Sequence, residues 1–200
     1  MTTARACAAR QVGRDHYERL HRTSVKYQQN NWLLDDVARL VAAGGESILE
    51  VGCGNGLFLE QASQHWTHIV GVDWVRPEGL DRVLAEHPAI GFVEQDITRL
   101  DVEQQFDLLV SADVLEHLHP SALPAVLRRL HACGRRGYHK IACYDDGHSH
   151  LSVLRPRQWL RLFEDAAPNG AYRILGCERR DGRRTKPVAV ITNLTFQNVP

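Results

Sequence analysis

The amino-acid sequence predicts an α/β protein built on a doubly wound, mostly parallel sheet of seven strands, with an antiparallel strand at the carboxyl end. Short apolar runs rich in β-branched residues alternate along the chain with runs whose apolar residues recur at helical spacing. Such alternation requires right-handed crossovers, which place helices on both faces of a parallel sheet. The last two strand-like runs are joined by a short polar link containing Asp-Gly, which predicts a hairpin.

The individual elements follow from apolar runs and from the residues that punctuate them. Asn31 is predicted to cap the first core helix and Gly44 to end it. Pro156 is predicted to begin the last helix, because proline suits a first helical turn. The predicted strands are 47–53, 68–74, 90–97, 106–113, 137–144, 172–179 and 187–196, and the other predicted helices are 56–63, 77–87 and 123–133.

Length and composition predict one soluble unit. The chain has 200 residues, so we expect a single domain in which residues 1–45 form a helical lid and lead-in helix and residues 46–200 form the core. The 24 basic and 24 acidic side chains cancel, which favours neither a polyanionic partner nor an acidic one. Five scattered cysteines without CxxC spacing suit a reducing compartment, and no run approaches the roughly 18 apolar residues of a membrane span. We therefore expect a cytoplasmic protein without a membrane partner.

A glycine-rich turn follows the first predicted strand. Gly52, Gly54 and Gly56 stand at alternate positions where the strand turns into a helix, so the backbone can approach a ligand closely and present helix N–H groups to it. Asp73 ends the next strand about twenty residues later, where a carboxylate can accept hydrogen bonds from ribose hydroxyls. This spacing predicts a nucleoside-containing cofactor.

Two further carboxylates distinguish between the cofactors that carry a ribose. Glu50 lies just before the glycines, where it could hold the cationic amine of a methionyl group but would repel a pyrophosphate. Asp96 ends the third strand and can accept from an adenine amino group. These residues favour S-adenosylmethionine over NAD.

With these motifs, nearly the whole chain resembles the class I S-adenosylmethionine-dependent methyltransferases, of the type that acts on small molecules and sugars. Their four motifs resemble Glu50–Gly56, Asp73, Gln95–Ile97 and residues 106–118, "FDLLVSADVLEHL". The resemblance implies a Rossmann-like fold and S-adenosylhomocysteine as product. It also implies a cofactor site formed by Glu50, Gly52, Cys53, Gly54, Gly56, Asp73, Trp74, Asp96, Ile97, Ser111 and Ala112.

Histidines follow the fourth and fifth strands, which would be neighbours, so we expect their loops to converge on the acceptor. An alcohol or ammonium acceptor must lose a proton, and a neutral histidine suits that task. His150 is the preferred general base, because "HLSV" and the helix after it resemble a segment of small-molecule methyltransferases in which a loop histidine enters the pocket. His148 and His117 are the other candidates.

The same loops admit a second interpretation. Asp113, Glu116 and His117, joined by His150, supply the carboxylate and imidazole ligands of a divalent metal. The set resembles that of small-RNA 3′-terminal 2′-O-methyltransferases, from which it departs by having Asp113 in place of a glutamate. Because the LEHL sequence is also frequent in methyltransferases without metal, the prediction is for no metal, with this set as the alternative.

The segment 14–30 carries aromatic and cationic side chains without a clean apolar face. In similar enzymes the segment before the first strand forms a lid over the acceptor, which would place Tyr17, His21 and Tyr27 at the substrate. A solvated helix is the other interpretation.

The sequence thus predicts a methyltransferase acting on oxygen or nitrogen of a small metabolite or a sugar-containing natural product, with a small molecule rather than nucleic acid as its partner. Two alternatives stay open: metal-assisted 2′-O-methylation of RNA, and a non-catalytic module that only binds the cofactor. The sequence predicts neither the acceptor nor the oligomeric state.

Overall fold

The computed structural model describes residues 13–181 and 184–196. The strands are β1 (Ser47–Val51), β2 (His68–Asp73), β3 (Ile90–Glu94), β4 (Leu108–Ala112), β5 (Gly137–Ala142), β6 (Arg173–Ile174), β7 (Cys177–Asp181) and β8 (Arg184–Thr192). The α-helices are α1 (Arg14–Thr23), α2 (Val25–Gln29), α3 (Val37–Ala42), α4 (Leu57–Ala62), α5 (Glu78–Glu86), α6 (Leu123–Cys133) and α7 (Pro156–Ala166). Three 3₁₀ turns are η1 (Trp32–Asp36), η2 (Ile97–Arg99) and η3 (Leu115–His117).

The strands form one sheet in the order β3-β2-β1-β4-β5-β8-β6, with β7 also paired to β8. Strands β1 to β5 are parallel, and β8 runs antiparallel to β5. Arg173 of β6 lies opposite Thr192 of β8, whereas Cys177 of β7 lies opposite Val188, so β6 and β7 share one edge position. The sheet therefore has seven positions and an antiparallel carboxyl-terminal strand, which confirms the predicted fold class.

One predicted element differs in detail. The strand expected at 172–179 is divided into β6 and β7, because Gly176 adopts a left-handed φ of +74° that interrupts the extended backbone. The expected hairpin is formed by β7 and β8, and its link at 182–183 lies outside the described residues. Asn31 caps the following turn as predicted, since its side chain accepts a hydrogen bond from the N–H of Leu33 at 2.9 Å.

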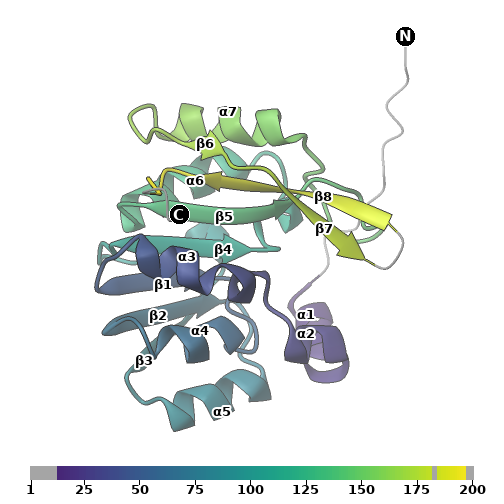
Figure 1. Cartoon of the computed structure of the whole chain (residues 1–200). Helices are drawn as coiled ribbons and strands as arrows, with labels where there is room; N and C mark the ends of the chain where they lie inside the picture. The colour runs from purple at the N-terminus through teal and green to yellow at the C-terminus, as the bar shows by residue number, and fades with distance from the viewer. Residues whose placement is uncertain (1–12, 182–183, 197–200) are drawn as a thin grey trace.

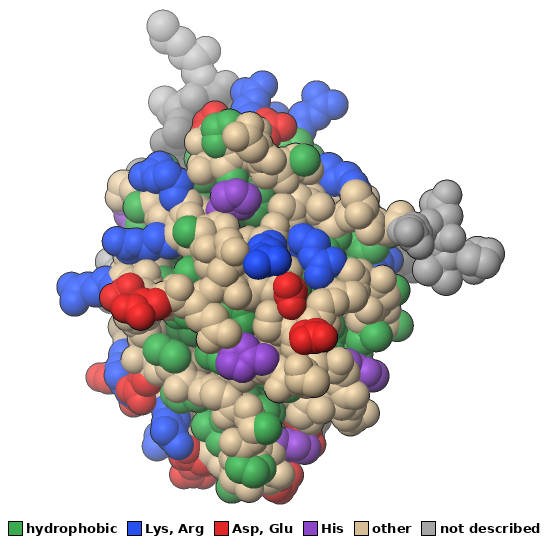
Figure 2. Space-filling model, turned by 90° about the vertical axis from the view of Figure 1, so that its left-hand side faces the viewer, with side chains coloured by type: hydrophobic (Ala, Val, Ile, Leu, Met, Phe, Trp, Pro, Cys, Tyr) green, Lys and Arg blue, Asp and Glu red, His purple; other side chains and the backbone are tan. Residues whose placement is uncertain are grey.

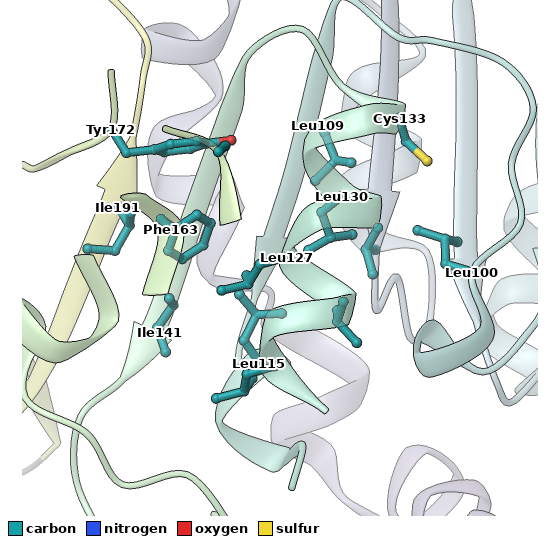
Figure 3. Packing of buried hydrophobic residues seen from close by; sticks show 14 of the residues in the cluster. Leu100, Leu109, Leu115, Leu127, Leu130, Cys133, Ile141, Phe163, Tyr172 and Ile191 are labelled. Carbon is teal, nitrogen blue, oxygen red and sulfur yellow. The ribbon is translucent and has the colours of Figure 1, made fainter. Parts of the chain in front are cut away.

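Helices cover both faces of the sheet, and each face has its own core (Figure 1). On one face α6 and α7 pack on the central strands, with Leu127 and Phe163 against Ile141 and Ile191 (Figure 3). On the other, apolar residues of α3, α4 and α5 pack on the sheet in a second cluster. Burying both faces accounts for the nearly continuous apolar character of β1, β4 and β5.

The two short N-terminal helices lie beside the carboxyl ends of the parallel strands (Figure 1). The opposite end of the molecule, which faces the viewer in Figure 2, carries interspersed basic and acidic side chains among its described residues. In the part of the chain that the structure describes, every helix is too short or too polar to cross a membrane.

Candidate active site

A cavity of about 270 Å³ opens at the carboxyl ends of β1, β2, β3 and β4. This is the expected place, because ligands of doubly wound sheets bind beyond the carboxyl ends of the strands where the strand order reverses. Its walls include predicted cofactor residues, predicted lid residues and two histidines that follow β4, His117 and His119. Among the predicted site residues, those that line it are Tyr17, His21, Tyr27, Gly52, Cys53, Gly54, Asp73, Trp74, Asp96, Ile97, Ala112, Asp113 and His117.

The glycine turn is shaped to let a ligand approach its backbone. Gly52 has φ +76°, and a Cβ added there would lie 2.2 Å from Cγ2 of Val114. Gly54 has φ +52°, and its N–H donates to Oδ2 of Asp73 at 2.8 Å. This bond fixes the turn after β1 to the end of β2, and both Gly54 and Asp73 line the same cavity. Gly56 is not on the cavity wall; it begins α4 in a left-handed conformation against Leu80.

Glu50 lies beneath this turn rather than on the cavity wall. The side chain is almost fully buried, its Oε1 accepts from Nδ2 of Asn31 at 2.8 Å, and its Oε2 has no hydrogen-bond partner in the described structure. Burial raises the pKa of Glu50 well above its usual value, although the bond from Asn31 opposes this. An unpartnered buried oxygen next to the glycine turn fits a cationic amine that a bound ligand would supply.

Ser111 was expected in the cofactor site, but its side chain lies on the other face of the sheet. Its hydroxyl is within 2.8 Å of Nδ1 of the buried His139, under α7. Adjacent residues of a strand point to opposite faces, so Ser111 and Ala112 cannot both face one ligand. Ala112 is the one that lines the cavity.

The lid segment is attached to the glycine turn by a residue that sequence reasoning did not single out. Nδ2 of Asn55 donates to the carbonyl of Tyr27 at 2.8 Å and lies 3.2 Å from Nδ1 of His21. Tyr17 places its ring 5.6 Å from that of Trp74 and 5.9 Å from that of His117, as edge contacts. The aromatic side chains of the two helices therefore line the cavity, and their role as a lid over an acceptor stays a prediction.

In the loop after β5, the carboxylate of Asp146 fixes a turn that orients His148 and His150 differently. Oδ1 of Asp146 accepts from the backbone N–H groups of His148, Ser149 and His150 at 2.8 to 3.0 Å. Burial would raise the pKa of Asp146, but these bonds and the one from the Ser149 hydroxyl outweigh it and lower the pKa. The turn points His148 outward, with half of its side chain exposed, and buries His150.

His150 and His117 form the inner part of the acceptor side. Their rings lie 4.8 Å apart at an edge contact, and His117 is the one that reaches the cavity wall. Nδ1 of His117 lies 3.2 Å from the carbonyl of Ser149, which fixes the ring toward the loop. Burial lowers the pKa of His117, so this imidazole is neutral at neutral pH.

The cavity thus combines a doubly wound sheet, a glycine turn after β1 and carboxylates after β2 and β3, which are the features of class I S-adenosylmethionine-dependent methyltransferases. Residues 48–137 match the family model described as "Methyltransferase domain".

Curated relatives and solved structures are consistent with this assignment. Nodulation protein S of Rhizobium tropici is 40% identical over 73 residues, or 35% of this chain and 30% of that protein. A ubiquinone biosynthesis O-methyltransferase of Aeromonas salmonicida (strain A449) is 28% identical over 112 residues, or 54% of this chain and 45% of the relative. The chain thus spans less than half the length of these two relatives.

Among solved structures, the N-methyltransferase NodS from Bradyrhizobium japonicum WM9 in complex with S-adenosyl-L-homocysteine has the same fold. It aligns with a TM-score of 0.66 and 17% sequence identity over 90% of this chain and 97% of that chain.

The state of Asp73 predicts a pH dependence of cofactor binding. Burial, opposed by hydrogen bonds from backbone N–H groups, raises the pKa of Asp73 to about 6, so the carboxylate is ionised above pH 6 and protonates below it. Because only the ionised form can accept two ribose hydrogen bonds, we expect affinity for S-adenosylhomocysteine to fall about tenfold between pH 7 and pH 5. Calorimetric titration at both pH values measures this. Asp73→Asn should bind weakly and without pH dependence; a wild-type affinity that is constant over this range would contradict the role of Asp73.

Proposed function

We propose that the chain transfers the methyl group of S-adenosylmethionine to an oxygen or nitrogen of a small-molecule acceptor, a metabolite or a sugar-containing natural product. The observation that carries the proposal is the continuity of the cavity, because predicted cofactor residues after β1, β2 and β3 line the same space as His117. One relative is named an O-methyltransferase, and one solved structure with the same fold is named an N-methyltransferase. These names support oxygen and nitrogen alike as the acceptor atom.

In this proposal the residues of the chain position the cofactor from three sides. The Glu50 carboxylate lies beneath the methionyl end, Asp73 accepts from the ribose, and Asp96 with the backbone of Ile97 faces the adenine. Oδ1 of Asp96 is already engaged by the N–H of Thr98 at 2.8 Å, which orients the carboxyl group at the cavity wall. When bound, S-adenosylmethionine supplies an electrophilic methyl group on its sulfonium.

In this proposal the histidines after β4 and β5 accept the proton that the acceptor loses. Methyl transfer forms the bond from the acceptor atom to the methyl carbon and breaks the bond from that carbon to sulfur, leaving S-adenosylhomocysteine and a proton to be removed. The imidazole pair of His117 and His150 lies next to Asp113 on this side, and His117 is neutral and at the wall. Tyr17 and Tyr27 line the cavity, and in this proposal they limit the access of water to the reacting atoms.

The test is turnover. We expect labelled S-adenosylmethionine to give S-adenosylhomocysteine with at least one member of an acceptor panel of phenols, sugars and amines. Binding of the cofactor without turnover on any acceptor would favour the non-catalytic module instead.

Replacement of His117 provides a sharper prediction. We expect His117→Gln to lower kcat by about 100-fold, the usual contribution of a positioned proton acceptor, while affinity for S-adenosylhomocysteine stays unchanged. His65→Gln, which alters an exposed histidine before β2, is the matched control and should keep full activity. Equal activity of His117→Gln and wild type would remove His117 from the mechanism.

A further inference from the structure

The charged groups on the cavity wall are mostly carboxylates. Those among the described wall residues belong to Asp73, Asp96 and Asp113. Against them, Lys26 is the one lysine or arginine in the described part of the wall. Two wall histidines add no charge at neutral pH, because burial lowers the pKa of His21 to about 4 and lowers that of His117 as well. The wall is therefore negatively charged and favours a ligand with positive charge.

One of these carboxylates has no part in holding the cofactor. In the proposed function Asp73 accepts from the ribose and Asp96 faces the adenine, whereas Asp113 lies in the segment after β4. The carboxyl group of Glu116, which is fully buried, is hydrogen-bonded to Asp113. Burial raises the pKa of Glu116 well above its usual value, and the charge of Asp113 adds to this increase, so Glu116 keeps its proton. The pair therefore places one negative charge on the cavity wall, at Asp113.

Aromatic side chains lie around this charge. Burial raises the pKa of Tyr17, and among the neighbouring charges Asp113 raises it most. The same is true of Tyr27, so both phenols lie in the field of Asp113. The Tyr17 ring also makes edge contacts with the rings of His117 and Trp74, at 5.9 and 5.6 Å between centroids. A carboxylate among aromatic rings is an environment that stabilises an ammonium group, through charge-assisted hydrogen bonds and cation–π contacts.

We infer that the acceptor is a cationic amine, that Asp113 and the ring of Tyr17 bind its ammonium group, and that its nitrogen is methylated. The inference rests on the proposed function and chooses between the two acceptor atoms which that function leaves open. A neutral alcohol would gain less from Asp113, and a carboxylate would be repelled by it. The Asp113 side chain is only 19% exposed, so water screens its charge less than that of the exposed Lys26, whose Nζ lies 5.6 Å from the Tyr27 ring centroid.

The ammonium group must lose a proton before its nitrogen can react. Nδ1 of His117 lies 3.2 Å from the carbonyl of Ser149, and because a carbonyl only accepts, Nδ1 carries the hydrogen of the neutral ring. Nε2 of His117 therefore has the lone pair that takes the proton. The freed lone pair of the amine forms the bond to the methyl carbon, and the carbon–sulfur bond breaks with its electron pair left on sulfur. A primary amine thus gives a methylated ammonium ion, S-adenosylhomocysteine and a protonated His117.

The experiment measures binding apart from catalysis, by calorimetric titration of the protein saturated with S-adenosylhomocysteine. The probes are amines, each matched to the alcohol and the carboxylate of similar size, from methylammonium to the set of 2-phenylethylamine, 2-phenylethanol and phenylacetate. We expect the amines to bind about tenfold more tightly than the alcohols, and the carboxylates to bind most weakly. Failure of every amine to bind, or tighter binding of the alcohols or carboxylates, overturns the inference.

Variants of Asp113 and Tyr17 locate the binding site. Asparagine tolerates the φ of +59° at position 113, so Asp113→Asn removes the charge and keeps the backbone. We expect it to lower amine affinity about tenfold and to leave alcohol and S-adenosylhomocysteine affinity unchanged. Tyr17→Phe keeps the ring and should bind amines more tightly than Tyr17→Leu. Asp165→Asn, which removes an exposed carboxylate on α7, is the matched control. Equal amine affinity of wild type and Asp113→Asn would contradict the assignment of Asp113.

Turnover with labelled S-adenosylmethionine separates this inference from the proposed function. We expect the amines to be methylated on nitrogen faster than the matched alcohols are methylated on oxygen. Faster methylation of the alcohols overturns the inference and leaves the proposed function intact. Amine binding that depends on Asp113, without turnover of any probe, fails the proposed function instead.

Discussion

Substitution of Gly52 by alanine is expected to weaken binding of S-adenosylhomocysteine by on the order of 100-fold, which corresponds to about 2.7 kcal/mol. Two costs combine at this position. An alanine at φ +76° costs about 1 to 2 kcal/mol, and its Cβ would lie 2.2 Å from Cγ2 of Val114, which forces the turn or the segment after β4 to move. Both segments line the cavity, so movement of either one disturbs the cofactor residues. Calorimetric titration measures the loss.

The matched control separates backbone strain from steric displacement. Gly44 has φ +71°, yet a Cβ there would meet no atom within 4 Å. Gly44→Ala therefore carries a similar conformational cost without a clash and lies away from the cavity. We expect it to lower the free energy of unfolding by about 1 kcal/mol and to keep cofactor affinity. Wild-type affinity of Gly52→Ala would show that this turn does not hold the cofactor.

The second large effect, on the free energy of unfolding, is expected from substitution at a buried ion pair. Lys140 on β5 and Asp36 in η1 are both buried, with Nζ and Oδ2 2.5 Å apart, and Nζ also donates to the carbonyl of Trp32 at 2.9 Å. Asp36→Ala leaves an ammonium group buried without its counter-ion, so we expect a loss of about 3 to 5 kcal/mol in the free energy of unfolding. Urea denaturation monitored by circular dichroism measures it.

Two further variants test the cause of this loss. Arg39 is half exposed and binds the other oxygen of Asp36 at 2.8 Å, so Arg39→Ala should cost no more than about 1 kcal/mol. The double variant Asp36→Leu with Lys140→Met removes both charges and should recover much of the stability. Equal stability of Asp36→Ala and Arg39→Ala would contradict the burial argument.

The ion pair also matters for the site. It secures the segment that carries Asn31, whose amide bonds to Glu50. Loss of the pair should therefore reduce cofactor affinity as well as stability, and this link from η1 to the glycine turn is invisible in the sequence.

Sequence patterns were sufficient to predict the sheet and to place most of the predicted cofactor residues at one edge of it. Each parallel strand is a local apolar run, and the residue after it lies at the ligand edge of the sheet whatever the tertiary detail. Gly52, Asp73 and Asp96 could therefore be assigned to one edge before the fold was known. Strand alternation alone places the side chains of Ser111 and Ala112 in β4 on opposite faces of the sheet.

The sequence by itself determined the fold class and the edge of the sheet at which Asp73 ends β2 and Asp96 follows β3, because these depend on short-range periodicity. Only the tertiary structure decided which histidine of the 147–150 loop points inward, since that depends on one turn around Asp146 and on carbonyls from separate segments. The tertiary structure likewise brought Asp113, His117 and His150 together and placed the carbonyl of Tyr27 where Asn55 donates a hydrogen bond to it. Contacts between residues distant in the chain carry no periodic signal, so the arrangement of the side chains after β4 and β5 could not be predicted from the sequence.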